Sequence, residues 1–116
     1  MKNIAINPED YTILAVDDIA TNIMLLKAVL SRAKYKIVTA SGGYEAIEKA
    51  SKETPDLILL DIMMPELDGI RATAKLREGS NVPIILLTAK SEDTDKILGL
   101  NIGADDYITK PFNPVE

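Results

Sequence analysis

Short apolar runs recur along the chain and alternate with segments of helical periodicity. Three runs, at residues 12–16, 57–60 and 83–87, show no alternation of polar with apolar positions. That pattern is typical of strands covered on both faces. Two weaker runs, at residues 36–40 and 107–109, suit strands nearer the edges of a sheet. The pattern therefore predicts five strands.

The first two intervening segments have apolar residues at helical spacing. A helix over residues 20–33 would turn Ile23, Leu26, Leu30 and Ala33 inward. A second helix would run over residues 43–53, with Ile47 and Ala50 facing inward. Ser41 is a candidate N-cap for this second helix, and Thr54-Pro55 would end it.

Two further helices are predicted in the second half of the chain. Asp68 can cap a helix that runs through residue 77, with Ile70 and Ala74 on its inner stripe. A fourth helix would begin at Asp93 or Thr94, and Gly103 is a natural left-handed stop for it. Strands that alternate with helices at this spacing predict an α/β fold with a doubly wound parallel sheet.

The last four residues carry the signals of a helix start. Asn113 suits an N-cap, Pro114 the first helical position and Glu116 the third. We expect that most of a fifth helix is missing from this chain, and that the natural protein continues beyond it.

Composition narrows the classes of function. The length of 116 residues indicates one domain, and a net charge of −5 with scattered basic residues argues against direct contact with nucleic acid. No apolar run approaches the ~20 residues of a membrane span, and residues 1–10 do not resemble a secretory signal. We therefore expect a soluble, cytoplasmic domain without membrane contact. The absence of Cys and His excludes thiolate zinc sites, disulfides and catalysis by an imidazole of this chain.

Polar side chains end four of the five predicted strands. Asp17 and Asp18 follow the first strand, Asp61 follows the third, Thr88 ends the fourth and Lys110 comes just after the fifth. In an open α/β sheet, ligands bind beyond the carboxyl ends of the strands. If these strands are neighbours, the five groups converge on one crevice.

These residue types suit phosphoryl chemistry with a metal ion. Clustered carboxylates without Cys or His favour Mg²⁺, which commonly takes one or two carboxylates, water and phosphate oxygens. Asp61 could attack phosphorus, while Lys110 and Thr88 could bind the phosphoryl oxygens. Three carboxylates and one lysine leave a formal charge of about −2, which one Mg²⁺ would cancel.

Four sequence blocks resemble the signature of response-regulator receiver domains of two-component signalling. They are Val16-Asp17-Asp18, Leu60-Asp61-Ile62-Met63-Met64-Pro65-Glu66-Leu67-Asp68-Gly69, Leu87-Thr88-Ala89 and Gly103-Ala104-Asp105-Asp106-Tyr107-Ile108-Thr109-Lys110-Pro111-Phe112. They occur in the order and at the spacing of that family, across about residues 12 to 112. The resemblance implies a flavodoxin-like fold with strand order 2-1-3-4-5, in which residues 12–116 form the receiver and residues 1–11 an N-terminal extension.

The resemblance also implies roles for the residues that form the metal site. Asp61 matches the phosphoacceptor, and Asp17 and Asp18 match the acidic pair that binds Mg²⁺, with Asp18 in direct contact and Asp17 through water. Met63 stands where the family uses a backbone carbonyl as a metal ligand.

Further roles concern the phosphoryl group and the conformational switch. Thr88 and Lys110 match the phosphoryl-binding pair, and Lys110-Pro111 matches a bond that the family usually holds cis. Tyr107 matches the switch aromatic, which turns inward when Thr88 moves toward the phosphoryl group. Lys90 stands at a variable position that tunes autodephosphorylation.

The implied function is a phosphorylation switch rather than an enzyme. A sensor histidine kinase would supply a phosphohistidine, since this chain has no His. The switched surface would act on a downstream output domain, or form a homodimer through the face of the fourth helix and fifth strand.

Three other readings stay open at this point. A Mg²⁺-dependent phosphatase with an aspartyl-phosphate intermediate usually has a second acid two residues after the nucleophile, where this chain has Met63. A flavodoxin-like nucleotide binder would need a Gly-rich loop in place of Asp17-Asp18. The third alternative is a receiver that binds proteins without being phosphorylated.

Overall fold

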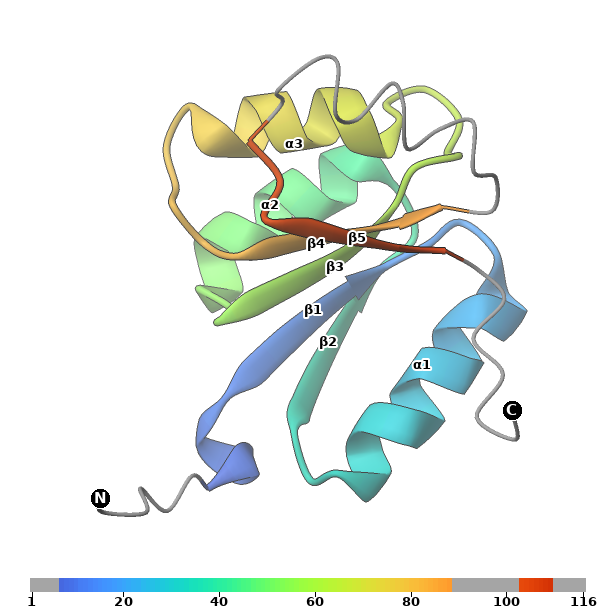
Figure 1. Ribbon diagram of the computed structural model, residues 1–116, viewed down its shortest axis with the longest axis vertical. Coiled ribbons are helices and arrows are strands. Elements are labelled where there is room, and N and C mark those ends of the chain that lie inside the picture. The colour runs from blue at the N-terminus through green and yellow to red at the C-terminus, as the bar shows by residue number, and fades with distance from the viewer. Residues whose placement is uncertain (1–6, 89–102, 110–116) are drawn as a thin grey trace.

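The computed structural model describes residues 7–88 and 103–109 of the chain. It shows one five-stranded, all-parallel sheet with strand order β2-β1-β3-β4-β5 and helices on both faces (Figure 1). This is the predicted doubly wound α/β fold, with the two weaker strands at the edges. In chain order the elements are a 3₁₀ turn η1 (Pro8–Asp10), β1 (Thr12–Val16), α1 (Ala20–Arg32), β2 (Lys36–Ala40), α2 (Gly43–Glu53), β3 (Leu57–Asp61), α3 (Gly69–Arg77), β4 (Ile84–Thr88) and β5 (Asp106–Thr109).

Alternate side chains of the central strands enter two apolar clusters, one on each face of the sheet. Leu14, Ile58 and Leu86 belong to the larger cluster, which the apolar stripes of α2 and α3 complete. Ile13, Leu59 and Leu87 belong to the smaller cluster, against which half-buried residues of α1 pack. Burial on both faces explains why these strands read as continuous apolar runs in the sequence.

The start of α2 differs from the prediction. Gly42, not Ser41, occupies the N-cap position, and it has an extended backbone with φ −169°. Both the N–H and the hydroxyl of Ser41 donate to Oε1 of Glu45, each over 2.9 Å. The prediction of a Ser41 cap was therefore wrong, because the serine hydroxyl is used as a donor to the carboxylate.

The inner stripe of α3 was also misplaced in part. Asp68 caps the helix as expected, since its Oδ1 accepts from the N–H of Arg71 over 2.8 Å. Ile70 is half-buried against the core, but Ala74 is exposed. The fully buried positions are instead Gly69, Ala72, Thr73 and Leu76. Thr73 tolerates burial because its hydroxyl donates to the carbonyl oxygen of Gly69 over 2.7 Å.

The remaining helix ends agree more closely with the sequence. Thr54 ends α2 in the left-handed conformation, with φ 43°. The first helix stops at Arg32, so the predicted inward residue Ala33 is its exposed C-cap. Gly103 has a left-handed φ of 95°, but the predicted fourth helix that it would end, and the fifth helix, lie outside the described residues, so its role as a helix stop stays a prediction. No helix in the described part of the chain is long and apolar enough to cross a bilayer.

Candidate functional site

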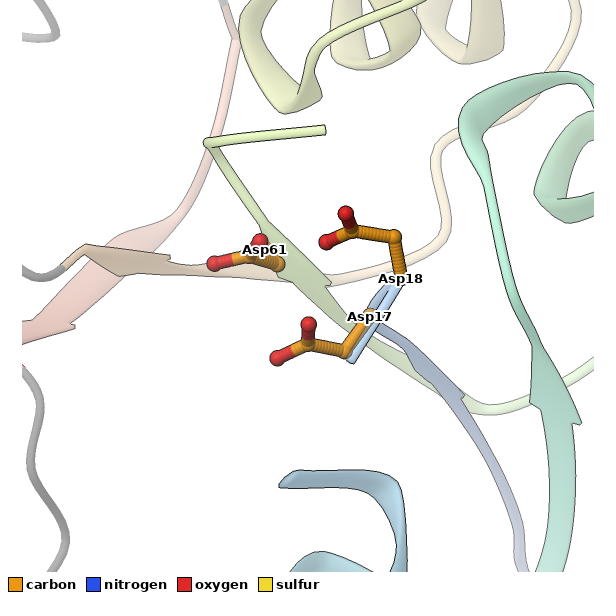
Figure 2. Close-up of side chains that lie close together, drawn as sticks. All are labelled: Asp17, Asp18 and Asp61. Atoms are coloured by element: carbon orange, nitrogen blue, oxygen red, sulfur yellow. The ribbon is translucent and has the colours of Figure 1, made fainter. Parts of the chain in front are cut away.

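Three carboxylates meet beyond the carboxyl ends of β1 and β3. The two strands are parallel neighbours with Val16 opposite Leu60, so Asp17 and Asp61 take equivalent places at the sheet edge. One carboxylate oxygen from each of Asp17, Asp18 and Asp61 lies within 4.8 Å of the other two. Figure 2 shows the three side chains pointing to the same side of the strand ends. The predicted convergence of these acids is therefore present.

The acids differ in burial and in the way they are held. Asp17 is 1% exposed and Asp61 is 3% exposed, whereas Asp18 faces solvent. Oδ1 of Asp17 accepts from the backbone N–H of Ile19 over 3.0 Å, and its Oδ2 accepts from Nδ2 of Asn22 over 3.1 Å. Both oxygens of Asp17 are thus oriented from the start of α1. No sequence pattern pointed to Asn22, because its role depends on how α1 approaches the strand.

The loop between β3 and α3 is fastened at both ends beside the third acid. The N–H of Ile62 donates to the carbonyl of Leu87 over 3.0 Å, which ties the loop to β4. The N–H of Gly69 donates to the carbonyl of Ile62 over 2.9 Å, which ties the loop to α3. Met63 lies within this loop with an exposed side chain. The assignment of its backbone carbonyl as a metal ligand stays a prediction.

Two more predicted residues lie on β4 and β5. Leu87 is paired with Asp61, so the fully buried Thr88 stands one residue beyond, at the end of β4. Tyr107 of β5 is half-buried and packs against the larger core cluster. Lys110, Pro111 and Lys90 lie outside the described residues, so their proposed roles remain sequence predictions.

A cavity of about 320 Å³ opens beside the acids, between the start of α1 and the start of α2. Asp17 and Asp18 form one side of it, Glu45 and Lys49 lie on another, and Met24 is part of its apolar wall. Asp17 and Asp18 therefore border a cavity that opens toward the start of α2.

Glu45 does not belong to the acid cluster but to a network of hydrogen bonds and an ion pair with Ser41 and Lys49. The two hydrogen bonds from Ser41 and the nearby Lys49 ammonium lower the pKa of Glu45 to about 2. Nζ of Lys49 lies 3.1 Å from the Glu45 carboxylate and also donates to the carbonyl of Thr39. The network joins the first turns of α2 to the end of β2.

The donor set of the acid cluster fits a hard divalent cation. Three carboxylates offer only oxygen ligands, one of them exposed, and neither His nor Cys is present to favour a softer metal. Within the described ranges, no other group of three acidic side chains converges in this way. Asp17, Asp18 and Asp61 could therefore hold Mg²⁺.

Comparison with known proteins agrees with the fold. Residues 13–116 match the sequence profile of the response regulator receiver domain. The chain is 53% identical to the alkaline phosphatase synthesis transcriptional regulatory protein PhoP of Bacillus subtilis, over 90% of this chain and 44% of PhoP. It is 51% identical to the transcriptional regulatory protein SrrA of Staphylococcus aureus, over 90% of this chain and 43% of SrrA.

Solved structures show the same relationship. The chemotaxis response regulator CheY4 of Vibrio cholerae superposes with a TM-score of 0.83 at 34% identity, covering 90% of each chain. The response regulator TrrA of Thermotoga maritima, solved in complex with Mg²⁺-BeF, gives a TM-score of 0.81 at 38% identity, covering 89% of each chain.

The chain belongs to the response regulator receiver domain family of two-component signalling. As a member of that family it is a domain controlled by phosphorylation of an aspartate. It spans somewhat less than half the length of the curated relatives that it matches.

Proposed function

We propose that Asp61 accepts the phosphoryl group and that Asp17, Asp18, Asp61 and the backbone carbonyl of Met63 bind Mg²⁺. The observation that carries this proposal is the convergence of three carboxylates beyond the ends of β1 and β3. Asp61 is the buried acid at the end of the central strand β3, while the exposed Asp18 suits direct metal contact. Asp17, with hydrogen bonds to both oxygens, suits contact through a water molecule.

Phosphoryl transfer would form an acyl phosphate on Asp61. A carboxylate oxygen of Asp61 attacks phosphorus, the bond to the donor nitrogen breaks, and the departing imidazole keeps the electron pair and takes up a proton. Bound Mg²⁺ supplies positive charge that offsets the repulsion between the carboxylates and the phosphoryl oxygens. Thr88 and Lys110 complete the proposed site as hydroxyl and ammonium donors to those oxygens.

The proposed switch follows from the same residues. Thr88 stands fully buried at the end of β4, and Tyr107 packs half-buried on the neighbouring strand. A phosphoryl group that draws Thr88 toward Asp61 would change the space available to Tyr107. Phosphorylation would then shift the population between two packings of one fold. We assign the protein as a switch that assists its own phosphorylation and slow dephosphorylation, not as an enzyme with a separate substrate.

We propose a sensor histidine kinase as the donor. Three exposed apolar side chains belong to the segments next to the acids: Ile19, which follows Asp18, is 51% exposed, Met24 in the cavity wall is 68% exposed, and Met63, two residues after Asp61, is 58% exposed. Exposed apolar side chains near an acidic site favour contact with another protein over contact with a small anion alone. The donor imidazole must come from such a partner, because this chain has no His.

The domain organisation and output are proposals of the same kind. We assign residues 12–116 to the receiver and residues 1–11 to an extension, which the start of β1 at Thr12 supports. An output domain that follows the receiver is supported by relatives named as transcriptional regulators that are more than twice as long. We infer a cytoplasmic location, with access to DNA, from such an output. The edge strand β5, on which Ile108 is exposed, suits a homodimer contact.

Intact mass spectrometry tests the assignment of Asp61. Incubation with Mg²⁺ and acetyl phosphate, or with phosphoramidate as a small P–N donor, should add one phosphoryl group to the chain. Asp61→Asn should abolish the adduct, and Asp10→Asn, which changes an exposed acid of η1, should leave it unchanged. No adduct on folded, Mg²⁺-saturated protein would contradict the proposal, as would an adduct that persists in Asp61→Asn. Repeated turnover of a phosphate ester such as p-nitrophenyl phosphate would favour the phosphatase instead.

A further inference from the structure

Arg77, the last residue of α3, bonds to two separate loops through its guanidinium group. Its Nη1 donates to the carbonyl oxygens of Val82 over 2.7 Å and Ser80 over 3.3 Å, in the loop before β4. Its Nε donates to the carbonyl oxygen of Gly103 over 2.8 Å, and its Nη2 forms an ion pair with Asp105 over 2.9 Å, both just before β5. The Arg77 side chain is only 20% exposed. One side chain therefore links α3, the start of β4 and the start of β5.

Asp105 fastens the start of β5 to the start of β4. Its N–H donates to the carbonyl of Ile84 over 2.9 Å, and its Oδ2 accepts from the N–H of Ile84 over 2.8 Å. The same Oδ2 receives the hydrogen bond from Arg77. The next residues then pair as Ile85 with Asp106 and onward along the ladder. The Asp105 contacts thus lie in register with this ladder, and Arg77 contacts the same carboxylate oxygen that binds Ile84.

The register of β5 depends on its ladder with β4, on the packing of Tyr107 and on the Asp105 contacts. β5 has four residues, lies at the edge of the sheet and has β4 as its neighbour on one side. In the observed register Tyr107 packs against the larger core cluster, while Ile108 is 43% exposed. A slip of one residue would exchange the faces of these two side chains, because side chains alternate along a strand. Without the fastening at Asp105, the register of β5 would depend on the β4 ladder and on the packing of Tyr107 alone.

From this arrangement we propose that Arg77 is a positioning residue for phosphoryl transfer: through Asp105 it fixes the register of β5, and with it Tyr107 and the segment that leads into Lys110. The inference rests on the proposed function of Asp61 and Lys110. Arg77 itself belongs to the opposite edge of the sheet, because it follows the end of α3 and contacts residues that precede β4 and β5. It contacts none of Asp17, Asp18 and Asp61 in the hydrogen bonds and ion pairs described.

Because Arg77 lies apart from the acids, a loss of its positioning effect can be distinguished from a general loss of stability. The proposed Mg²⁺ ligands lie on β1, β3 and their loops, which Arg77 does not hold. Loss of the Arg77 contacts should therefore slow phosphorylation while leaving Mg²⁺ affinity unchanged. Partial unfolding of the domain would lower both together.

The test compares Arg77→Met, Arg77→Lys and Asp105→Asn, with Lys75→Met as a control that removes an exposed cation from the last turn of α3.

We expect Arg77→Met to slow phosphorylation by acetyl phosphate at saturating Mg²⁺ at least tenfold, with a Mg²⁺ Kd within twofold of wild type by calorimetry. Amide exchange of residues 106–109 should accelerate. Arg77→Lys should restore part of the rate, because it keeps one donor and the charge. The double variant of Arg77→Met with Asp105→Asn should be no slower than Arg77→Met, and Lys75→Met should match wild type.

Several outcomes would overturn the inference. One is an unchanged rate in Arg77→Met with unchanged exchange of the Tyr107 amide; another is a rate and a Mg²⁺ affinity that fall in parallel. If Arg77→Met does not fold, the milder Asp105→Asn carries the same test. If wild type forms no adduct at all, the proposed function fails, and amide exchange alone then decides whether Arg77 sets the register of β5.

Discussion

Gly69 and Asp61 are packed backbone against backbone. A Cβ atom on Gly69 would overlap the carbonyl oxygen of Asp61 and would lie 2.8 Å from the Cα of Ile62. The N–H of Gly69 also donates to the carbonyl of Ile62 over 2.9 Å. The first turn of α3 therefore lies directly against the strand that ends in the proposed phosphoacceptor, and only glycine permits this approach.

Gly69→Ala should damage both the fold and the site. The added methyl group has no space, so α3 or the loop after Asp61 must move, at a cost of about 1–3 kcal/mol in the free energy of unfolding. Urea unfolding should show this loss, and phosphorylation by acetyl phosphate should slow in the fraction that stays folded. Gly79→Ala is the matched control, since nothing lies within 4 Å of a Cβ placed there. Equal stability of the two variants would contradict the packing described.

Asp18→Asn should have opposite effects on stability with and without Mg²⁺. In EDTA the substitution removes one of three carboxylates whose oxygens lie within 4.8 Å, so relief of repulsion should raise the unfolding free energy. In wild type, each tenfold rise in Mg²⁺ above its Kd should add about 1.4 kcal/mol. Asp18→Asn should lose most of that increment at millimolar Mg²⁺. Thermal unfolding across a Mg²⁺ titration measures both effects, and a stabilisation by Mg²⁺ that survives the substitution would exclude Asp18 as a ligand.

Asn22→Ala should weaken Mg²⁺ binding without removing a carboxylate. Nδ2 of Asn22 donates a hydrogen bond to Oδ2 of Asp17 and so orients the carboxylate. Removing a side chain that orients a metal ligand typically lowers metal affinity by about 10-fold or more. Calorimetry should show the weaker binding, together with slower phosphorylation at subsaturating Mg²⁺ that recovers at high Mg²⁺. Thr21→Ala, at an exposed position on the same helix turn, should leave both unchanged. A Mg²⁺ affinity equal to wild type in Asn22→Ala would show that the hydrogen bond does not orient Asp17 for binding.

The parts of the fold that were predictable are those fixed by local pattern. The strand at Thr12–Val16 and the helix at Gly43–Glu53 have the bounds that their apolar runs and end signals indicated. Asp17, Asp18 and Asp61 could be grouped from sequence because each follows a parallel strand, and parallel strands bring their carboxyl ends to one edge. The strand order itself came from the family resemblance and is confirmed.

The parts that were not predictable depend on packing between distant segments. Ala74 was expected to face the core, but Thr73 does so instead. A helix of nine residues with few large apolar side chains does not show from its sequence alone which face is buried. Arg77 reads as an ordinary charge near a helix end, and its partners Gly103 and Asp105 are more than 25 residues away in sequence. Such contacts follow from the crossover geometry, which no local pattern encodes.

Glu45 should contribute to stability at neutral pH and lose that contribution in acid. Its pKa in the folded chain is about 2, below its ordinary value of 4.5, because Ser41 donates two hydrogen bonds to it and Lys49 lies beside it. A depressed carboxyl pKa gives stability that is present above about pH 4.5 and is lost as the pH falls toward 2. Since the side chain is 41% exposed, solvent screening limits the effect to at most about 1 kcal/mol.

Urea unfolding of wild type and Glu45→Gln between pH 7 and pH 3 measures this contribution. Wild type should be the more stable protein at pH 5 to 7, and the difference should shrink steadily below pH 4.5. Glu48→Gln is the matched control, because its carboxylate lies 3.8 Å from Lys52, both side chains are about 70% exposed, and no side-chain hydrogen bond like those of Glu45 is seen for it within residues 7–88 and 103–109. A difference between wild type and Glu45→Gln that stays constant with pH would mean that the Ser41 and Lys49 contacts do not favour the ionised carboxylate. The start of α2 would then be held by packing rather than by this charge network.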